Sequence, residues 1–248
     1  MKVILSILYI IVITSCKNSS INKDYYVSCT TVRDVTDYHT LLPDANATLS
    51  LFDLANNKDQ AASYRYTEIT DKMLVPAIDI YLPDAATGER KNKDNAPMYR
   101  ERVILKFMDT IRKTLAIPVS KKDTTATLKH SECFKIISTE LNRLNQQQSI
   151  HKVLWVFSNL QENSSILSVF NSSIKKRLIT NADSIERIFE HTGLLPENLN
   201  KIIVVFSYLP QDRDDDQRFN LIVQLYKNML EKRGATVIIQ ATNKPVEL

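Results

Sequence analysis

Polar side chains follow two stretches of the chain that are predicted to be buried strands. Asp34, Thr36 and Asp37 follow the first stretch, and Ser158 and Asn159 follow the second, whose sequence is VLWVF. Ligands of open parallel sheets bind beyond the carboxyl ends of the strands. The paired carboxylates of Asp34 and Asp37 could hold Mg²⁺ there and position a water molecule. One hypothesis is therefore a metal-dependent hydrolase that acts on phosphoesters.

The glycine content excludes two common ways of holding a nucleotide. The chain has only three glycines, Gly88, Gly193 and Gly234. They lie too far apart to form a phosphate-binding loop or a dinucleotide fingerprint. We therefore expect no nucleotide cofactor. The sequence also lacks the Gly-x-Ser-x-Gly elbow of the α/β-hydrolases.

The histidines and one acidic run fit no metal motif. The four histidines are scattered without the spacing of zinc ligands: His39, His130, His151 and His191. Residues 212–216 (DRDDD) lack the Asp-x-Asp-x-Asp-Gly framework of a calcium loop. This run is better placed to begin a helix, where negative charge is favourable.

Four strands are predicted from apolar runs. Val153–Phe157, Ile202–Phe206 and Ala235–Ile239 are continuous and rich in β-branched residues, which is typical of parallel strands covered on both faces. Val27–Val35 is a more polar fourth strand. Asp34 lies at the end of this strand, so the sheet would position the carboxylates of Asp34 and Asp37.

Two further strands are predicted at an exposed edge of the sheet. Tyr64–Ile69 and Ala77–Leu82 show rough alternation of apolar and polar residues. Pro76 lies between them and Pro83 ends the second. This pair predicts a hairpin with one antiparallel edge strand.

Apolar residues at helical spacing predict five helices, and Gly234 is placed to end the last. They are Ala45–Leu54, Met98–Ala116, Ser131–Leu144, Asp183–Glu190 and Gln217–Lys232. The resulting order is β-α-β-β-α-α-β-α-β-α-β. It predicts an α/β fold with a doubly wound, mainly parallel six-stranded sheet, one antiparallel edge strand and helices on both faces.

This element order and the two strand ends resemble the von Willebrand factor type A (vWA) family. The resemblance rests on Asp-x-Thr after the first strand and Ser-Asn after the strand that contains Trp155, and it covers most of Val27–Asn243. It implies a Rossmann-like fold and protein binding rather than catalysis. It also implies Mg²⁺ or Mn²⁺, held by an Asp-x-Ser-x-Ser loop, a threonine of a second loop and an aspartate after the fourth strand.

Carried over by position, the resemblance implies a degenerate metal site. Asp34 matches the aspartate of the loop and Thr36 matches its first serine, whereas Tyr38 replaces the second serine. Asn159 replaces the later aspartate, and Asp37 could restore the lost charge. The second loop would supply one of Thr124, Thr125, Thr127 or Ser131. The alternative is that Asp34 and Thr36 only satisfy backbone donors in a turn.

The N-terminus predicts an exported lipoprotein. Lys2 is followed by the apolar run Val3–Ile13, which is short for a membrane-spanning helix and typical of a signal peptide. Ile13-Thr14-Ser15-Cys16 resembles the bacterial lipobox. We therefore expect residues 1–15 to be a signal peptide, Cys16 to carry the lipid, residues 16–24 to be a tether and residues 25–248 to be one domain. The alternative is an ordinary secretory signal with an incidental cysteine.

The expected location is the cell envelope, with the membrane contacted through the lipid anchor only. Lys17 is not the aspartate of an inner-membrane retention signal, which favours the periplasmic face of the outer membrane. The net charge of the chain is +4, which falls to +3 when Lys2 leaves with the signal peptide. No basic stripe is present, so we expect protein partners and no nucleic acid.

Cys29 and Cys133 remain after Cys16, and each lies in an apolar periodic segment. Two buried thiols are expected, although the sequence leaves a bridge open. For the function, three hypotheses stay open: a non-catalytic, membrane-anchored protein-binding module, the metal-dependent hydrolase described above, and an accessory subunit of an envelope secretion or conjugation machine.

Overall fold

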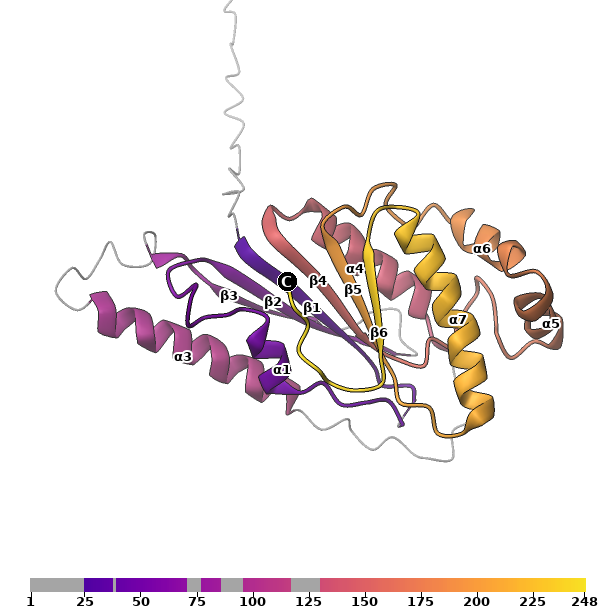
Figure 1. Ribbon diagram of the computed structural model, residues 1–248, viewed down its shortest axis with the longest axis horizontal. Coiled ribbons are helices and arrows are strands. Elements are labelled where there is room, and N and C mark those ends of the chain that lie inside the picture. The colour runs from indigo at the N-terminus through magenta and orange to yellow at the C-terminus, as the bar shows by residue number, and fades with distance from the viewer. Residues whose placement is uncertain (1–24, 38, 71–76, 86–95, 117–129) are drawn as a thin grey trace, which may run out of the picture.

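A computed structural model describes residues 25–37, 39–70, 77–85, 96–116 and 130–248. Six strands form one sheet in the order β3-β2-β1-β4-β5-β6 (Figure 1). They are β1 (Tyr25–Asp34), β2 (Ala62–Ile69), β3 (Ala77–Leu82), β4 (Ser149–Phe157), β5 (Ile202–Ser207) and β6 (Thr236–Gln240). Only the pairing of β2 with β3 is antiparallel. This confirms the predicted sheet, including the edge strand. The predicted signal peptide, Cys16 and its tether lie outside the described residues, as do Tyr38 and Thr125.

The strand β4 begins four residues before the apolar run that predicted it. Its first residue, Ser149, pairs with Tyr25 of β1, and residues 149–152 are exposed or half-buried. Backbone pairing to a neighbour therefore extends the strand beyond its buried part. Apolar content alone could not reveal this extension.

Helices cover both faces of the sheet (Figure 1), as predicted. They are α1 (Ala45–Ser50), α3 (Ala96–Leu115), α4 (Cys133–Gln146), α5 (Ser172–Thr180), α6 (Ala182–Glu190) and α7 (Arg213–Glu231). The expectation of a single helix between β4 and β5 was wrong, because α5 precedes α6. The helix α5 buries only Leu178 and so has no apolar stripe that the sequence could display.

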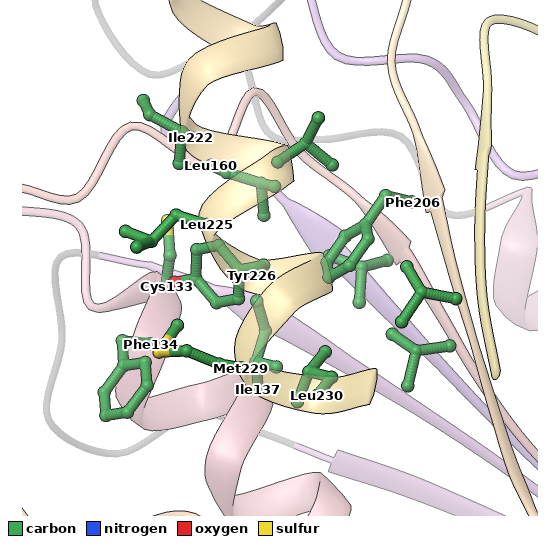
Figure 2. Close-up of a cluster of buried hydrophobic side chains, with 14 of the residues drawn as sticks. Cys133, Phe134, Ile137, Leu160, Phe206, Ile222, Leu225, Tyr226, Met229 and Leu230 are labelled. Carbon is green, nitrogen blue, oxygen red and sulfur yellow. The ribbon is translucent and has the colours of Figure 1, made fainter. Parts of the chain in front are cut away.

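One face of the sheet packs against α4 and α7. Figure 2 shows the apolar side chains of this layer, in which Tyr226 of α7 lies between α4 and β5. Its ring centroid is 6.3 Å from that of Phe134 on α4 and 5.7 Å from that of Phe206 on β5. The predicted stripe of α7 is therefore its buried face. This layer fixes the start of α4 beneath the strand ends.

The other face packs against α1 and α3. The Phe52 and Phe107 rings meet edge to face at 5.2 Å, and the Trp155 ring stacks on Phe157 at 5.3 Å. The indole Nε1 of Trp155 donates to Ser207 Oγ at 2.8 Å. The buried indole is thus satisfied by a residue at the end of β5, as buried polar groups must be.

Cys29 and Cys133 are free, buried thiols. Cys29 belongs to the core layer under α1 and α3, whereas Cys133 belongs to the layer under α4 and α7. The sheet lies between them, so the interpretation as two buried thiols is confirmed. Within the described ranges, no helix has both the length and the hydrophobicity needed to cross a membrane.

Gly234 ends α7 in a left-handed conformation, with φ of +91°. Its N–H donates to Glu231 O at 2.9 Å, and a Cβ added here would lie 2.0 Å from Asn200 Oδ1. We expect Gly234→Ala to lower the free energy of unfolding by about 2 kcal/mol, because backbone strain adds to the contact. Denaturant titration would measure the loss. Gly193→Ala is the matched control, since Gly193 has φ of +63° but no atom within 4 Å of an added Cβ. Equal losses in the two variants would contradict this account of Gly234.

Candidate functional site

The predicted site residues gather at the carboxyl ends of β1 and β4. The sheet order reverses between these two strands, since β2 and β3 continue on one side and β5 and β6 on the other. The connections that leave the two strands therefore diverge to opposite sides. This is the switch point at which open α/β sheets bind their ligands.

Asp34 is the last residue of β1 and forms the centre of the cluster. Its Oδ1 accepts hydrogen bonds from the backbone N–H and the hydroxyl of Thr36, at 2.9 and 2.6 Å. Its Oδ2 accepts from the Ser158 hydroxyl at 2.7 Å. The two bonds to Thr36 fold the chain back after the strand, as short polar side chains do in turns. The bond to Ser158 joins the ends of β1 and β4.

The charge of Asp34 is not balanced by any cation among the described residues. The side chain is 1% exposed, and its burial raises the pKa of the carboxyl group. Hydrogen bonds from Thr36 and Ser158 oppose this shift, while the charge of Asp37 adds to it. A buried carboxylate without a positive neighbour is costly, and either a proton or a bound cation would relieve the cost.

Ser131 is the one candidate of the second loop that falls within the described residues, and it lies at the site. Its Oγ is 3.5 Å from Thr36 Oγ1 and 3.2 Å from Cys133 Sγ. Two backbone hydrogen bonds of 2.9 and 3.0 Å pair Ser131 with Asn163, in the loop after β4. This pairing brings the start of α4 to the strand ends.

Asp37 and Asn159 form a second pair at the rim. Asn159 Nδ2 donates to Asp37 Oδ2 at 2.7 Å, while Asn159 Oδ1 accepts from the Gln161 N–H at 2.9 Å. The other oxygen of Asp37 accepts from the His39 N–H. The Gln161 donor fixes the orientation of the amide, so Asn159 turns its NH₂ group toward the carboxylate. The structure thus brings these residues together, with the amide oxygen of Asn159 directed to its own loop.

Two neighbours of Asp34 were absent from the predicted site. Ser158 was noted only as a strand-end residue, and Cys133 only as a core thiol. The Cys133 sulfur lies 4.0 Å from Asp34 Oδ2. Burial, followed by the charges of Asp34 and Glu162, raises the pKa of this thiol. It therefore stays protonated and can donate a weak hydrogen bond to Asp34.

Glu162 joins the loop after β4 to the start of α4, a role that no sequence motif predicts. The side chain is 1% exposed, and its Oε2 accepts from the Phe134 N–H at 2.8 Å. Its Oε1 accepts no hydrogen bond among the described residues. Burial raises the pKa of Glu162 to about 7, and the Ser164 hydroxyl and the Phe134 N–H oppose this shift. The carboxylate occupies the N-terminal end of the helix dipole, where negative charge is stabilised.

Backbone strain is present in the same loop. Leu160 follows Asn159 and has φ of +59°, although it is not glycine. Its side chain is buried in the layer shown in Figure 2, and its N–H donates to Ser158 Oγ at 2.9 Å. Packing and this hydrogen bond hold a conformation that costs about 1 kcal/mol or more. The left-handed turn at Leu160 directs the chain away from the sheet directly after Ser158 and Asn159.

The acidic run begins α7, as predicted. Asp212 caps the helix by accepting the Asp215 N–H at 2.8 Å, and the first turn is acidic. The Asp215 carboxylate accepts hydrogen bonds from the Tyr208 hydroxyl and the Gln211 N–H. Its other oxygen lies 3.5 Å from the Arg218 guanidinium. Unlike Asp34, this buried carboxylate has a positive neighbour.

The donor set at the strand ends fits a hard divalent cation. It consists of the Asp34 and Asp37 carboxylates and the Thr36 and Ser131 hydroxyls, and these are the oxygen ligands that Mg²⁺ and Mn²⁺ prefer. Across the described part of the chain, no group of three or more His, Cys, Asp or Glu residues could hold a metal ion. Any cation here would therefore depend on the hydroxyls as well as on two carboxylates.

Comparison of the chain with protein-family models gave no match, and comparison with curated proteins gave none either.

Proposed function

We propose that this protein is a non-catalytic binding module of the bacterial cell envelope, similar to vWA domains and anchored by a lipid on Cys16. It presents the loops at the carboxyl ends of β1, β4 and β5 to a protein partner. A divalent cation, Mg²⁺ or Mn²⁺, contributes to this surface through Asp34, Thr36, Asp37 and Ser131.

The single observation that carries the proposal is the uncompensated Asp34 carboxylate at the switch point of the sheet. Proteins bury charges with partners, because an isolated buried charge is strongly unfavourable. Here the neighbours are the Thr36 and Ser158 hydroxyls, with the Ser131 hydroxyl 3.5 Å beyond Thr36. These neighbours leave the negative charge of Asp34 unbalanced in the cation-free protein, which lowers its stability. A bound cation would balance this charge.

Exposed apolar side chains near the site support binding to a protein. Leu42 and Leu209 are exposed at the same edge of the sheet, where Asn243 after β6 donates to Leu42 O. Exposed leucines beside a polar cluster can supply the apolar contacts of a protein-binding surface.

Photocrosslinking in the envelope tests this proposal. A photoreactive amino acid in place of Leu209 should crosslink to a protein partner, and chelation of divalent cations with EDTA should reduce the yield several-fold. Asp34→Asn should reduce it to the same extent, because the cation loses its charged ligand. Glu186→Gln is the control, because this buried carboxylate on α6 pairs with Lys232, away from the loop that carries Leu209, and it should leave the yield unchanged.

The outcomes separate the parts of the proposal. A crosslink that resists both EDTA and Asp34→Asn would retain the binding surface and contradict the role of the cation. If position 209 gives no crosslink while Ile150, at the opposite edge, gives one to a protein, the proposed surface is wrong.

A further inference from the structure

The chain enters the domain at the edge of the sheet formed by the N-terminal ends of the parallel strands. The candidate site lies at the opposite edge, where these strands have their C-terminal ends. Strand β1 begins there with Tyr25, whose neighbour in the register is Ser149, the first residue of β4 (Figure 1). The C-terminal end of β3 lies at the same edge, because β3 runs antiparallel to β2. A ten-residue strand spans about 33 Å, so this edge and the candidate site are well separated.

Apolar side chains are exposed at this edge. Tyr81 of β3 is 52% exposed and stacks on Tyr25, with ring centroids 6.3 Å apart. Ile150 is 62% exposed and lies next to Ser149, the partner of Tyr25. Beneath this surface, Ser28 Oγ lies 2.7 Å from Ser63 Oγ and 2.6 Å from Ser149 Oγ, which ties the three strands together. The apolar side chains therefore stand on a rigid base.

Two positive charges lie beside these side chains. Lys152 follows Ile150 by two positions and so shares its face of β4, and its strand partner, Ile202, follows Lys201. Burial and the neighbouring Lys201 charge lower the pKa of Lys152. The two ammonium groups repel each other, and a nearby anionic surface would relieve this repulsion. We call Tyr25, Tyr81, Ile150, Lys152 and Lys201 the N-edge patch.

We propose that the N-edge patch rests on the anionic headgroup surface of the membrane that holds the lipid anchor. Tyrosine and lysine side chains with apolar bodies and polar tips suit the boundary between headgroups and acyl chains. Lysines close to an anionic lipid surface are attracted to it electrostatically. The site at the other edge of the sheet then faces away from the membrane, toward its partner.

The length of the chain before Tyr25 supports this occupant. The inference rests on the proposed lipidation of Cys16, and the nine steps from Cys16 to Tyr25 span at most about 32 Å. The patch is thus held within reach of the bilayer at a high effective concentration, so weak contacts suffice for docking.

Fluorescence quenching in vesicles tests the docking. The exported protein carries one introduced cysteine, Ile150→Cys in one variant and Leu209→Cys in the other, labelled with an environment-sensitive dye. Protein without an introduced cysteine should stay unlabelled, because Cys29 and Cys133 are buried. In vesicles of phosphatidylcholine and phosphatidylglycerol, brominated lipids should quench the dye at position 150 several-fold more than at position 209.

Charge reversal sharpens the test. Combining Lys152→Glu and Lys201→Glu with the label at position 150 should remove most of this quenching, whereas the lipid on Cys16 stays detectable by mass spectrometry. Equal quenching at the two positions, with Cys16 lipidated, would overturn the docking and leave the anchor standing. A blue-shifted dye at position 150 that brominated lipids do not quench would mean that a protein covers the patch, which also overturns it. An unmodified Cys16 would remove the anchor and the docking together.

Discussion

Asp34→Asn is expected to raise the free energy of unfolding of the cation-free protein by about 1–2 kcal/mol at neutral pH. The amide keeps an oxygen that accepts the Thr36 N–H and hydroxyl, and it removes a buried charge that no cation balances. The gain in stability is limited, because the NH₂ group of asparagine would replace the carboxylate oxygen that now accepts the hydrogen bond of the Ser158 hydroxyl. Denaturant titration in EDTA measures it.

With added Mg²⁺ or Mn²⁺, the wild type should become more stable than Asp34→Asn. A ligand that binds only the folded state stabilises it in proportion to the logarithm of its concentration above the dissociation constant. The wild type should therefore gain stability with millimolar cation, whereas Asp34→Asn should not. A destabilising substitution at Asp34 in EDTA, with no cation effect on the wild type, would show that the carboxylate serves the turn alone.

Asp215→Asn provides the control with the opposite sign. Asp215 is also buried at this edge, but it lies in the first turn of α7 and 3.5 Å from Arg218. Its charge is favourable there, so its removal should lower the free energy of unfolding by about 1 kcal/mol. Cation dependence should be the same as in the wild type.

Glu162→Gln is expected to flatten the pH dependence of stability between pH 5 and pH 8. The pKa of Glu162 is raised from 4.5 to about 7, mainly by burial, so the folded state holds this proton more tightly than the unfolded state does. The contribution of this group is therefore fully present below pH 4.5 and is lost as the pH rises through 7. At about 1.4 kcal/mol per pH unit, the loss is roughly 3 kcal/mol.

The glutamine variant isolates this effect. Its amide oxygen can still accept the Phe134 N–H, so the start of α4 keeps its cap. Urea titrations of both proteins at several pH values give the difference in stability, which should grow in favour of the variant toward pH 8. A difference that does not change with pH would contradict the protonated state of Glu162 in the folded protein.

The sequence predicted the sheet well because the apolar runs of β4, β5 and β6 leave few alternatives. It also placed Asp34 and Thr36 correctly at the end of β1, since the side chains that follow a buried strand must lie at the sheet edge. It did not predict α5, in which only Leu178 is buried. A helix on the surface without a stripe has no periodic signal.

The rest of the site depends on contacts between distant segments. The place of Ser131 at the site could not be predicted from the sequence, because it follows from pairing with Asn163. In the sequence, Glu162 is an ordinary loop residue. Only in the folded chain, where Ser131 pairs with Asn163, does its side chain lie in the interior. The amide orientation of Asn159 is likewise set by the Gln161 N–H. Such features need the folded chain, because residue types alone do not encode them.

The most direct test of the central claim is to locate Mn²⁺ in crystals of the protein by its anomalous scattering. The account predicts one strong peak at the ends of β1 and β4, within about 2.5 Å of oxygen atoms from the set Asp34, Thr36, Asp37 and Ser131. The peak should be missing in Asp34→Asn and present in Asp215→Asn. A peak confined to the acidic start of α7, or no peak at the strand ends at millimolar Mn²⁺, would contradict the proposed cation site.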